Sequence, residues 1–331
     1  MTMVQTVPPS FLRGIGKMVW SNSLPLLLIV VVAIFSAIRP ESYFSANNAQ
    51  MIASTNAVLA ILALAAVPPL VVGQFDLSIG FQLALAQSLC AGMIIYHSVA
   101  PPLAAAVVIA IGIAIGLANG LLVARAGLNA FITTLATGIV VQGFTQLYTD
   151  GASVFGAMPS PFLYFGRGRL FGVPLAFLYV LVIAAIMSVI YTYTRWGRQS
   201  FAIGGNARAA YLVGIPVDRV TIQSFVVAGA LSSIAGVLSC SILGSANPNI
   251  GINYLLPAFA AVFLGAAPAG PGRFNAWGAV VAVYALAAGI SGLQQLGAAF
   301  YVEQFFNGGA LLLAVALAKW MAGRSLAAMK K

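Results

Sequence analysis

Uninterrupted apolar stretches, each long enough for one membrane crossing, recur along nearly the whole chain. A helix that crosses a bilayer needs about 20 mostly apolar residues. Ten segments meet this requirement: 19–38, 50–72, 77–96, 102–124, 129–148, 172–194, 221–243, 253–267, 275–296 and 303–320. Strands of a membrane β-barrel alternate polar and apolar residues, whereas these runs are continuous. The pattern therefore predicts an all-α polytopic membrane protein of about ten transmembrane helices.

The composition excludes a soluble or a disordered chain. Of the 331 residues, 61% are hydrophobic and only 6% are charged, against about 25% charged residues in soluble proteins. Disorder requires low hydrophobicity and high charge. The net charge of +10 would suggest nucleic acid in a soluble protein. In a membrane protein it indicates orientation instead, so we expect the lipid bilayer and no nucleic acid as a partner.

The basic residues predict which side of the membrane each loop faces. With the N-terminus inside and ten spans, twelve Lys and Arg fall in inside segments, and three (Arg39, Arg167 and Arg169) fall outside. Cytoplasmic loops carry such an excess of Lys and Arg, which places both termini in the cytoplasm. The chain then divides into an N-terminal tail (1–18), a single transmembrane domain (19–320) and a basic C-terminal tail (321–331).

One span is expected to be interrupted. Pro68-Pro69 falls within the second apolar segment, and Gly73-Gln74-Phe75-Asp76 separates it from the third. Non-helical backbone at membrane depth is tolerated only where it is buried in protein or lines a cavity. Residues 68–80 therefore form a broken helix or a re-entrant segment, and the sequence leaves both open.

The inside loop 195–220 contains a short helix with clear end signals. Asn206 is a good N-cap, residues 207–213 provide about two turns, and Gly214 stands where a left-handed residue ends a helix. Pro216 prevents continuation. Arg208, Tyr211 and Leu212 are its candidates for contact with a partner. The breaks between spans, among them Arg195-Trp196-Gly197-Arg198, contain residues typical of turns, so we expect turns there.

Catalysis finds little support in the side chains. The chain has one histidine, His97, no His/Cys/carboxylate cluster with metal spacing, and no G-x-x-x-x-G-K-[ST] phosphate loop. We therefore expect no enzyme activity, no metal site and no cofactor bound by this chain. A membrane-embedded enzyme is the weakest of the alternatives.

Uncharged polar side chains within the spans suggest a path for a neutral hydrophilic solute. Such groups are costly in lipid unless they are paired or face water, and helix–helix hydrogen bonding is the competing interpretation. Asp76 either caps the following helix or takes part in the path. The candidate pathway residues are Asp76, Ser78, Gln82, Asn119, Thr133, Thr134 and Thr137.

Gly112, Gly116 and Gly120 leave one face of the fourth span without side chains. Such a ladder allows another helix to approach closely. The spacing predicts helix packing, either within this chain or with another copy.

Three segments resemble the permease subunits of ribose-type ABC importers, the branch that serves ribose, xylose and galactose. Residues 73–80 are similar to the motif G-G-x-D-L-S-V-G, residues 118–137 to N-G-x-L…P-x-F-I-x-T-L-x-T, and residues 197–220 to G-R…A-I-G-G-N…A-A…G-I…V. The likeness extends over roughly residues 45–320. The resemblance implies a multi-pass protein of the bacterial inner membrane that moves a sugar or polyol.

The resemblance also implies partners. A second permease copy, identical or a paralogue, would complete the pathway, a periplasmic sugar-binding protein would deliver the solute, and a separate ABC ATPase would use the ATP. The ATPase-coupling residues would be Asn206, Ala207, Arg208, Ala209, Ala210, Tyr211, Leu212 and Gly214. A stand-alone channel or facilitator for small neutral solutes is the alternative, which leaves the capped cytoplasmic helix unexplained.

Overall fold

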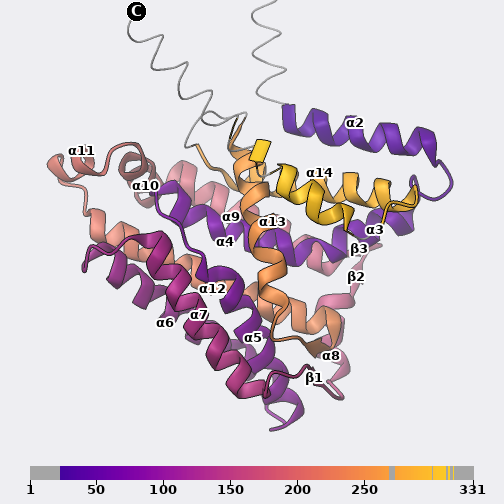
Figure 1. The fold of residues 1–331 in the computed structure, drawn as a ribbon, viewed down its shortest axis with the longest axis horizontal. Coiled ribbons are helices and arrows are strands. Elements are labelled where there is room, and N and C mark those ends of the chain that lie inside the picture. The colour runs from indigo at the N-terminus through magenta and orange to yellow at the C-terminus, as the bar shows by residue number, and fades with distance from the viewer. Residues whose placement is uncertain (1–22, 268–272, 300, 311, 314–315, 317–331) are drawn as a thin grey trace, which may run out of the picture.

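The protein is a bundle of long helices in a computed structural model that describes residues 23–267, 273–299, 301–310, 312–313 and 316 (Figure 1). Within these residues, six helices are long and apolar enough to cross a membrane, or seven if the bent pair α3–α4 is one span, and two shorter apolar helices, α2 and α13, accompany them. The expected all-α polytopic fold is confirmed. Its helices are α2 (Ser23–Ile38), α3 (Ala46–Thr55), α4 (Ala57–Val71), α5 (Ser78–Ile95), α6 (Pro101–Ala124), α7 (Ala130–Thr149), α8 (Ser160–Arg167), α9 (Leu175–Tyr193), α10 (Arg195–Gly205), α11 (Ala207–Leu212), α12 (Val217–Leu243), α13 (Ile250–Ala266) and α14 (Ala276–Gln295).

Each of the first nine expected spans has a helical counterpart, from α2 to α14. Of the tenth expected span, residues 303–310 are helical. The rest of that span and both tails, 1–18 and 321–331, lie mostly or wholly outside the described residues.

The interruption lies in two places. Between α3 and α4 the chain bends by 42° at Asn56, whose backbone and side-chain N–H groups both donate to the carbonyl of Ile52. The expectation that Pro68-Pro69 interrupts the span is wrong, because both prolines lie inside α4. All residues of α4 except Leu59 are buried, and this close packing holds the helix through the prolines. A second, non-helical break, residues 72–77, joins α4 to α5.

The core of the bundle is formed by α4 and α5. Both are buried on nearly every side, as expected of helices surrounded by others, and α12, α7 and α13 pack against them. Next to this core, α6 packs along α12 through Gly112, Gly116 and Gly120, whose missing side chains admit the backbone and side chains of α12. The partner of the glycine ladder is therefore a helix of the same chain.

The two ends of the bundle differ. At one end the strand β1 (Val154–Phe155) pairs antiparallel with β4 (Ser245–Ala246). There too, β2 (Arg169–Leu170) pairs with β3 (Val173–Pro174), so the loop 150–170 is structured. At the other end, α10 and α11 project from the bundle (Figure 1).

The turn expected at Arg195-Trp196-Gly197-Arg198 is wrong, because these residues open α10. Thr194 caps this helix by accepting a hydrogen bond from the backbone N–H of Gly197 at 3.2 Å. Ile203 of α10 is buried against the bundle. The loop therefore holds two helices in sequence, joined at Asn206.

Candidate functional site

A buried polar cluster surrounds Ser78 at the start of α5. The hydroxyl of Ser78 donates to Oδ1 of Asp76 at 2.5 Å, and its backbone N–H donates to the same oxygen at 3.0 Å. Gln82 and Asn119 donate their side-chain amides to Oγ of Ser78 at 2.7 and 2.9 Å. Asp76, in the break before α5, therefore holds the first turn of that helix, and Asn119 ties α6 to it.

Thr134 extends the cluster to α7. Its hydroxyl accepts the backbone N–H of Leu77 at 2.9 Å and donates to the carbonyl of Ala130 in its own helix. Asp76, Ser78, Gln82, Asn119 and Thr134 are all at most 1% exposed. These five predicted pathway residues lie together, but they are sealed from solvent and join three helices in this conformation.

Three acceptor oxygens in the cluster have no partner among the described residues. They are Oδ2 of Asp76, Oε1 of Gln82 and Oδ1 of Asn119. Leaving a buried acceptor without a hydrogen bond costs about 1–3 kcal/mol. The cluster is therefore not a fully satisfied structural network, and it retains capacity for further hydrogen bonds.

Thr133 and Thr137 share no hydrogen bond with this cluster among the described residues. Thr133 is buried, and Thr137 donates to its carbonyl at 2.9 Å. Thr137 also lies on the wall of a mostly apolar groove of about 770 Å³ between α5, α6 and α7. The structure does not bring these two threonines into contact with Asp76.

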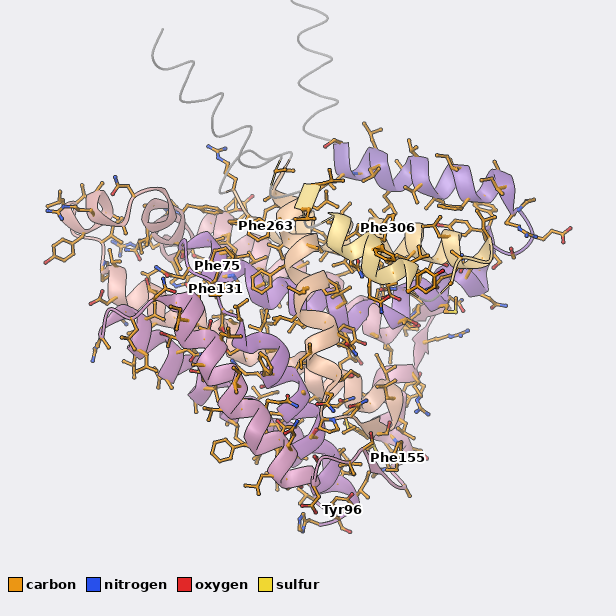
Figure 2. All side chains as sticks on the ribbon, viewed as in Figure 1. Phe75, Tyr96, Phe131, Phe155, Phe263 and Phe306 are labelled. Carbon is orange, nitrogen blue, oxygen red and sulfur yellow. The ribbon has the colours of Figure 1, made fainter. Side chains whose placement is uncertain are left out.

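Aromatic rings beside Asp76 were missed by the sequence reasoning. Phe75 stacks on Phe259 and Phe263 of α13 with ring centroids 6.0 and 6.1 Å apart, and it meets Phe131 of α7 edge-on at 6.4 Å. Figure 2 shows Phe75, Phe131 and Phe263 near one another, far from Phe155 and Tyr96 at the opposite end. No local signal pointed to this cluster, because its members come from three distant segments.

The short helix α11 has the ends that its sequence predicts. Oδ1 of Asn206 accepts the backbone N–H of Ala209 at 2.9 Å, and Gly214 has φ +83°. Ala210 is buried, while Tyr211 and Leu212 are 72% and 77% exposed. The remaining residues of the set, Ala207, Arg208 and Ala209, are also exposed. An apolar pair on so short a helix is therefore free to bind a partner.

The α10–α11 unit touches the break that carries Asp76. A Cβ built on Gly204 of α10 would stand 3.1 Å from the carbonyl carbon of Val71 and 3.7 Å from the backbone nitrogen of Gly73. A small buried apolar cluster spans the same junction, and it consists of Val72, Ile203, Ala210 and Val220. A displacement of α11 would therefore be transmitted through these packed residues to the start of α5.

Nothing at these positions resembles a catalytic centre. His97 is exposed in the loop after α5, at the opposite end from α11. Over the described part of the chain, no group of three or more His, Cys, Asp or Glu is placed to hold a metal ion. A bundle of membrane helices with a buried polar cluster and an exposed, capped helix at one end defines the membrane subunit of a transporter.

Comparison with known proteins identifies the kind of transporter. The family described as branched-chain amino acid transport system / permease component matches residues 48–315. A ribose import permease of Bacillus subtilis is 36% identical over 294 residues, covering 88% of this chain and 91% of the relative. The D-allose transport system permease of Escherichia coli is 31% identical, covering 88% and 89%. A galactose/methyl galactoside import permease of Salmonella typhimurium is 32% identical, covering 88% and 91%.

The chain belongs to this family of ABC importer permeases. It is a multi-pass membrane subunit that is not itself catalytic, and ATP is used by a partner ATPase. No solved structure matches the chain.

Proposed function

We propose that the chain is the permease through which an ATP-driven importer moves a neutral sugar of the ribose, allose or galactose kind into a bacterial cell. The kinship with permeases for these sugars supports the solute class. The scarcity of charge within the spans also suits a neutral solute, because a sugar requires hydrogen-bonding groups without fixed charge. A periplasmic binding protein delivers the sugar, and a second permease copy completes the pathway.

The ATPase docks on α11. Within this chain the six-residue helix α11 is held through the buried Ala210, and its exposed Tyr211 and Leu212 are left for a partner. Membrane-surface helices carry several basic residues opposite a broad apolar face, whereas α11 has Arg208 alone. The capped and exposed geometry of α11 is the observation that carries the proposal. If the ATPase docks on α11, the excess of basic residues on that side of the chain also supports both termini in the cytoplasm.

Movement reaches the pathway through α10. Gly204 lies against the backbone of Val71, and the break 72–77 follows directly. Asp76 and Ser78 couple that break to α5, and Asn119 and Thr134 couple it to α6 and α7. A shift of α11 therefore changes how three helices meet at the polar cluster, where three acceptor oxygens are available for a passing hydroxyl group.

Reconstitution tests the proposed function directly. Proteoliposomes that contain the permease, its ATPase and ATP should take up the sugar only when the binding protein is present. Liposomes with the permease alone should not equilibrate the sugar. Uptake by the permease alone, without ATP, would instead establish the stand-alone facilitator.

A further inference from the structure

A groove of about 930 Å³ lies at the periphery of the bundle, at the end that carries α10 and α11. Its walls are α6 and α12 on one side and α9 and α10 on the other, and Pro68 of α4 also lines it. No part of the substrate cluster or of α11 contributes to it. The groove is therefore separate from the polar cluster and from α11, although α10 and Val220 of the junction next to α11 contribute to its wall.

The rim of the groove is basic. Arg195 opens α10 and Arg219 lies in the first turn of α12, and both side chains are exposed. Neither makes an ion pair or a side-chain hydrogen bond with another described residue. The lining contains no carboxylate; Asp218 lines the adjoining groove, to which Arg125, Tyr211 and also Arg219 contribute. Two guanidinium groups without an ionic partner among the described residues thus stand just after the end of α9 and at the start of α12.

Two hydrogen-bond donors in the wall lack acceptors. Tyr191 is 7% exposed, and its hydroxyl has no partner within the described chain. The indole N–H of Trp196 is buried and is likewise without a partner there. Both residues line the groove, and their rings pack together with centroids 5.3 Å apart. Because an unmade buried hydrogen bond is costly, these donors call for an acceptor from outside the chain.

Apart from Thr194, Gln199 and Gln223, the rest of the wall is apolar, and it continues along the spans. A ligand that fits must therefore combine an anionic, oxygen-rich head with a hydrocarbon chain. Basic pockets between spanning helices on the cytoplasmic side bind anionic lipid head groups. The apolar lining includes Pro68, Leu117, Met187, Ile190, Val226 and Val227.

We infer that this groove binds an anionic phospholipid, with the phosphate between Arg195 and Arg219 and one acyl chain along α9 and α12. Tyr191 and Trp196 supply hydrogen bonds to the head group. The lipid fixes α10 against the ends of α9 and α12, next to the unit on which the ATPase docks. Binding of the lipid at this site requires neither the sugar nor the ATPase.

Binding of phosphatidylglycerol to the full-length permease in detergent tests the site, by native mass spectrometry with titration of the lipid. Phosphatidylcholine and inorganic phosphate are the parallel probes. The double variant Arg195→Gln/Arg219→Gln should weaken phosphatidylglycerol binding by about 30-fold, which corresponds to about fivefold for each basic residue near an anionic head group. Tyr191→Phe should weaken it severalfold, because one donor is removed.

Arg198→Gln is the matched control, since Arg198 lies on the same helix, has the same charge and does not line the groove. It should bind phosphatidylglycerol within about twofold of the wild type, because its charge acts only through the screened surface potential. Unchanged binding by the double variant would overturn the site. So would an equal loss in Arg198→Gln, equal binding of phosphatidylcholine, or binding of inorganic phosphate at the affinity of the lipid.

Discussion

Gly116 of α6 lies directly against the backbone of Phe225 in α12: a Cβ built on Gly116 would stand 2.9 Å from the carbonyl carbon of Phe225. The contact joins two spans that are separated by more than a hundred residues in the chain. It is the middle of three such contacts along the glycine ladder. The approach of α6 brings Asn119, one turn further along, within hydrogen-bonding distance of Ser78.

Gly116→Ala should destabilise the permease by about 1–3 kcal/mol, because the added methyl group overpacks a rigid backbone contact. The measurement is the unfolding midpoint of the purified protein in detergent. Gly143→Ala in α7 is the control, since a Cβ there meets no atom within 4 Å. A similar midpoint for the two variants would contradict the tight α6–α12 contact.

Asp76→Asn should leave membrane insertion intact and reduce sugar uptake. The amide retains an acceptor for Ser78, but the hydrogen bonds lose their charge assistance, a change worth about 1.5 kcal/mol and so about tenfold in rate. Uptake into cells and the amount of inserted protein are measured together. Uptake at the normal rate would leave Asp76 as a helix cap alone, since Asn also caps helices.

Replacing Tyr211 and Leu212 by Asp should detach the ATPase while the permease remains folded in the membrane. The reason is that two charges cannot enter an apolar protein groove without a large desolvation cost. Co-purification with the ATPase is the measurement. Phe155→Asp/Phe171→Asp is the control, because these side chains are 71% and 97% exposed and lie away from α11. Normal ATPase stoichiometry in the Tyr211/Leu212 variant would remove α11 as the docking element.

Gly204→Ala should uncouple ATP hydrolysis from uptake. Its methyl group would push α10 away from the Val71 carbonyl, so the assembled complex would hydrolyse ATP without moving the break 72–77. The neighbouring Gly205→Ala is the matched control, because a Cβ there meets nothing within 4 Å. Both are measured as sugar molecules taken up per ATP hydrolysed. Equal ratios for the two variants would show that the contact carries no coupling.

Reporter fusions after Lys331 and within the loop 150–170 should report opposite compartments, with the C-terminal fusion in the cytoplasm. The expected distribution of twelve basic residues inside and three outside is the reason, since Lys and Arg are retained in cytoplasmic loops. A periplasmic phosphatase and a cytoplasmic fluorescent protein serve as the two reporters. The same compartment for both sites would make the number of spans wrong.

The sequence by itself determined what depends on neighbouring residues along the chain. Membrane insertion follows from apolar length, and the ends of α11 follow from Asn206 and Gly214, whose capping and left-handed geometry are local properties. The resemblance to importer permeases was also carried by short sequence motifs. The beginning of α10 was missed because Gly197 and two arginines have the composition of a turn, although Thr194 is a usable N-cap.

Only the tertiary structure decided which segments meet. In the folded chain the glycine ladder packs against α12, and the helix bends at Asn56 and not at Pro68-Pro69. Asp76 is buried next to side chains from α6 and α7. The tertiary structure also assembled the aromatic cluster around Phe75 and the groove between Arg195 and Arg219 from segments far apart in the chain. In an apolar chain nearly every helix face is hydrophobic, so the pattern does not show which faces are buried in protein. Close packing and the pairing of scarce polar groups make that choice, and both depend on contacts between distant residues.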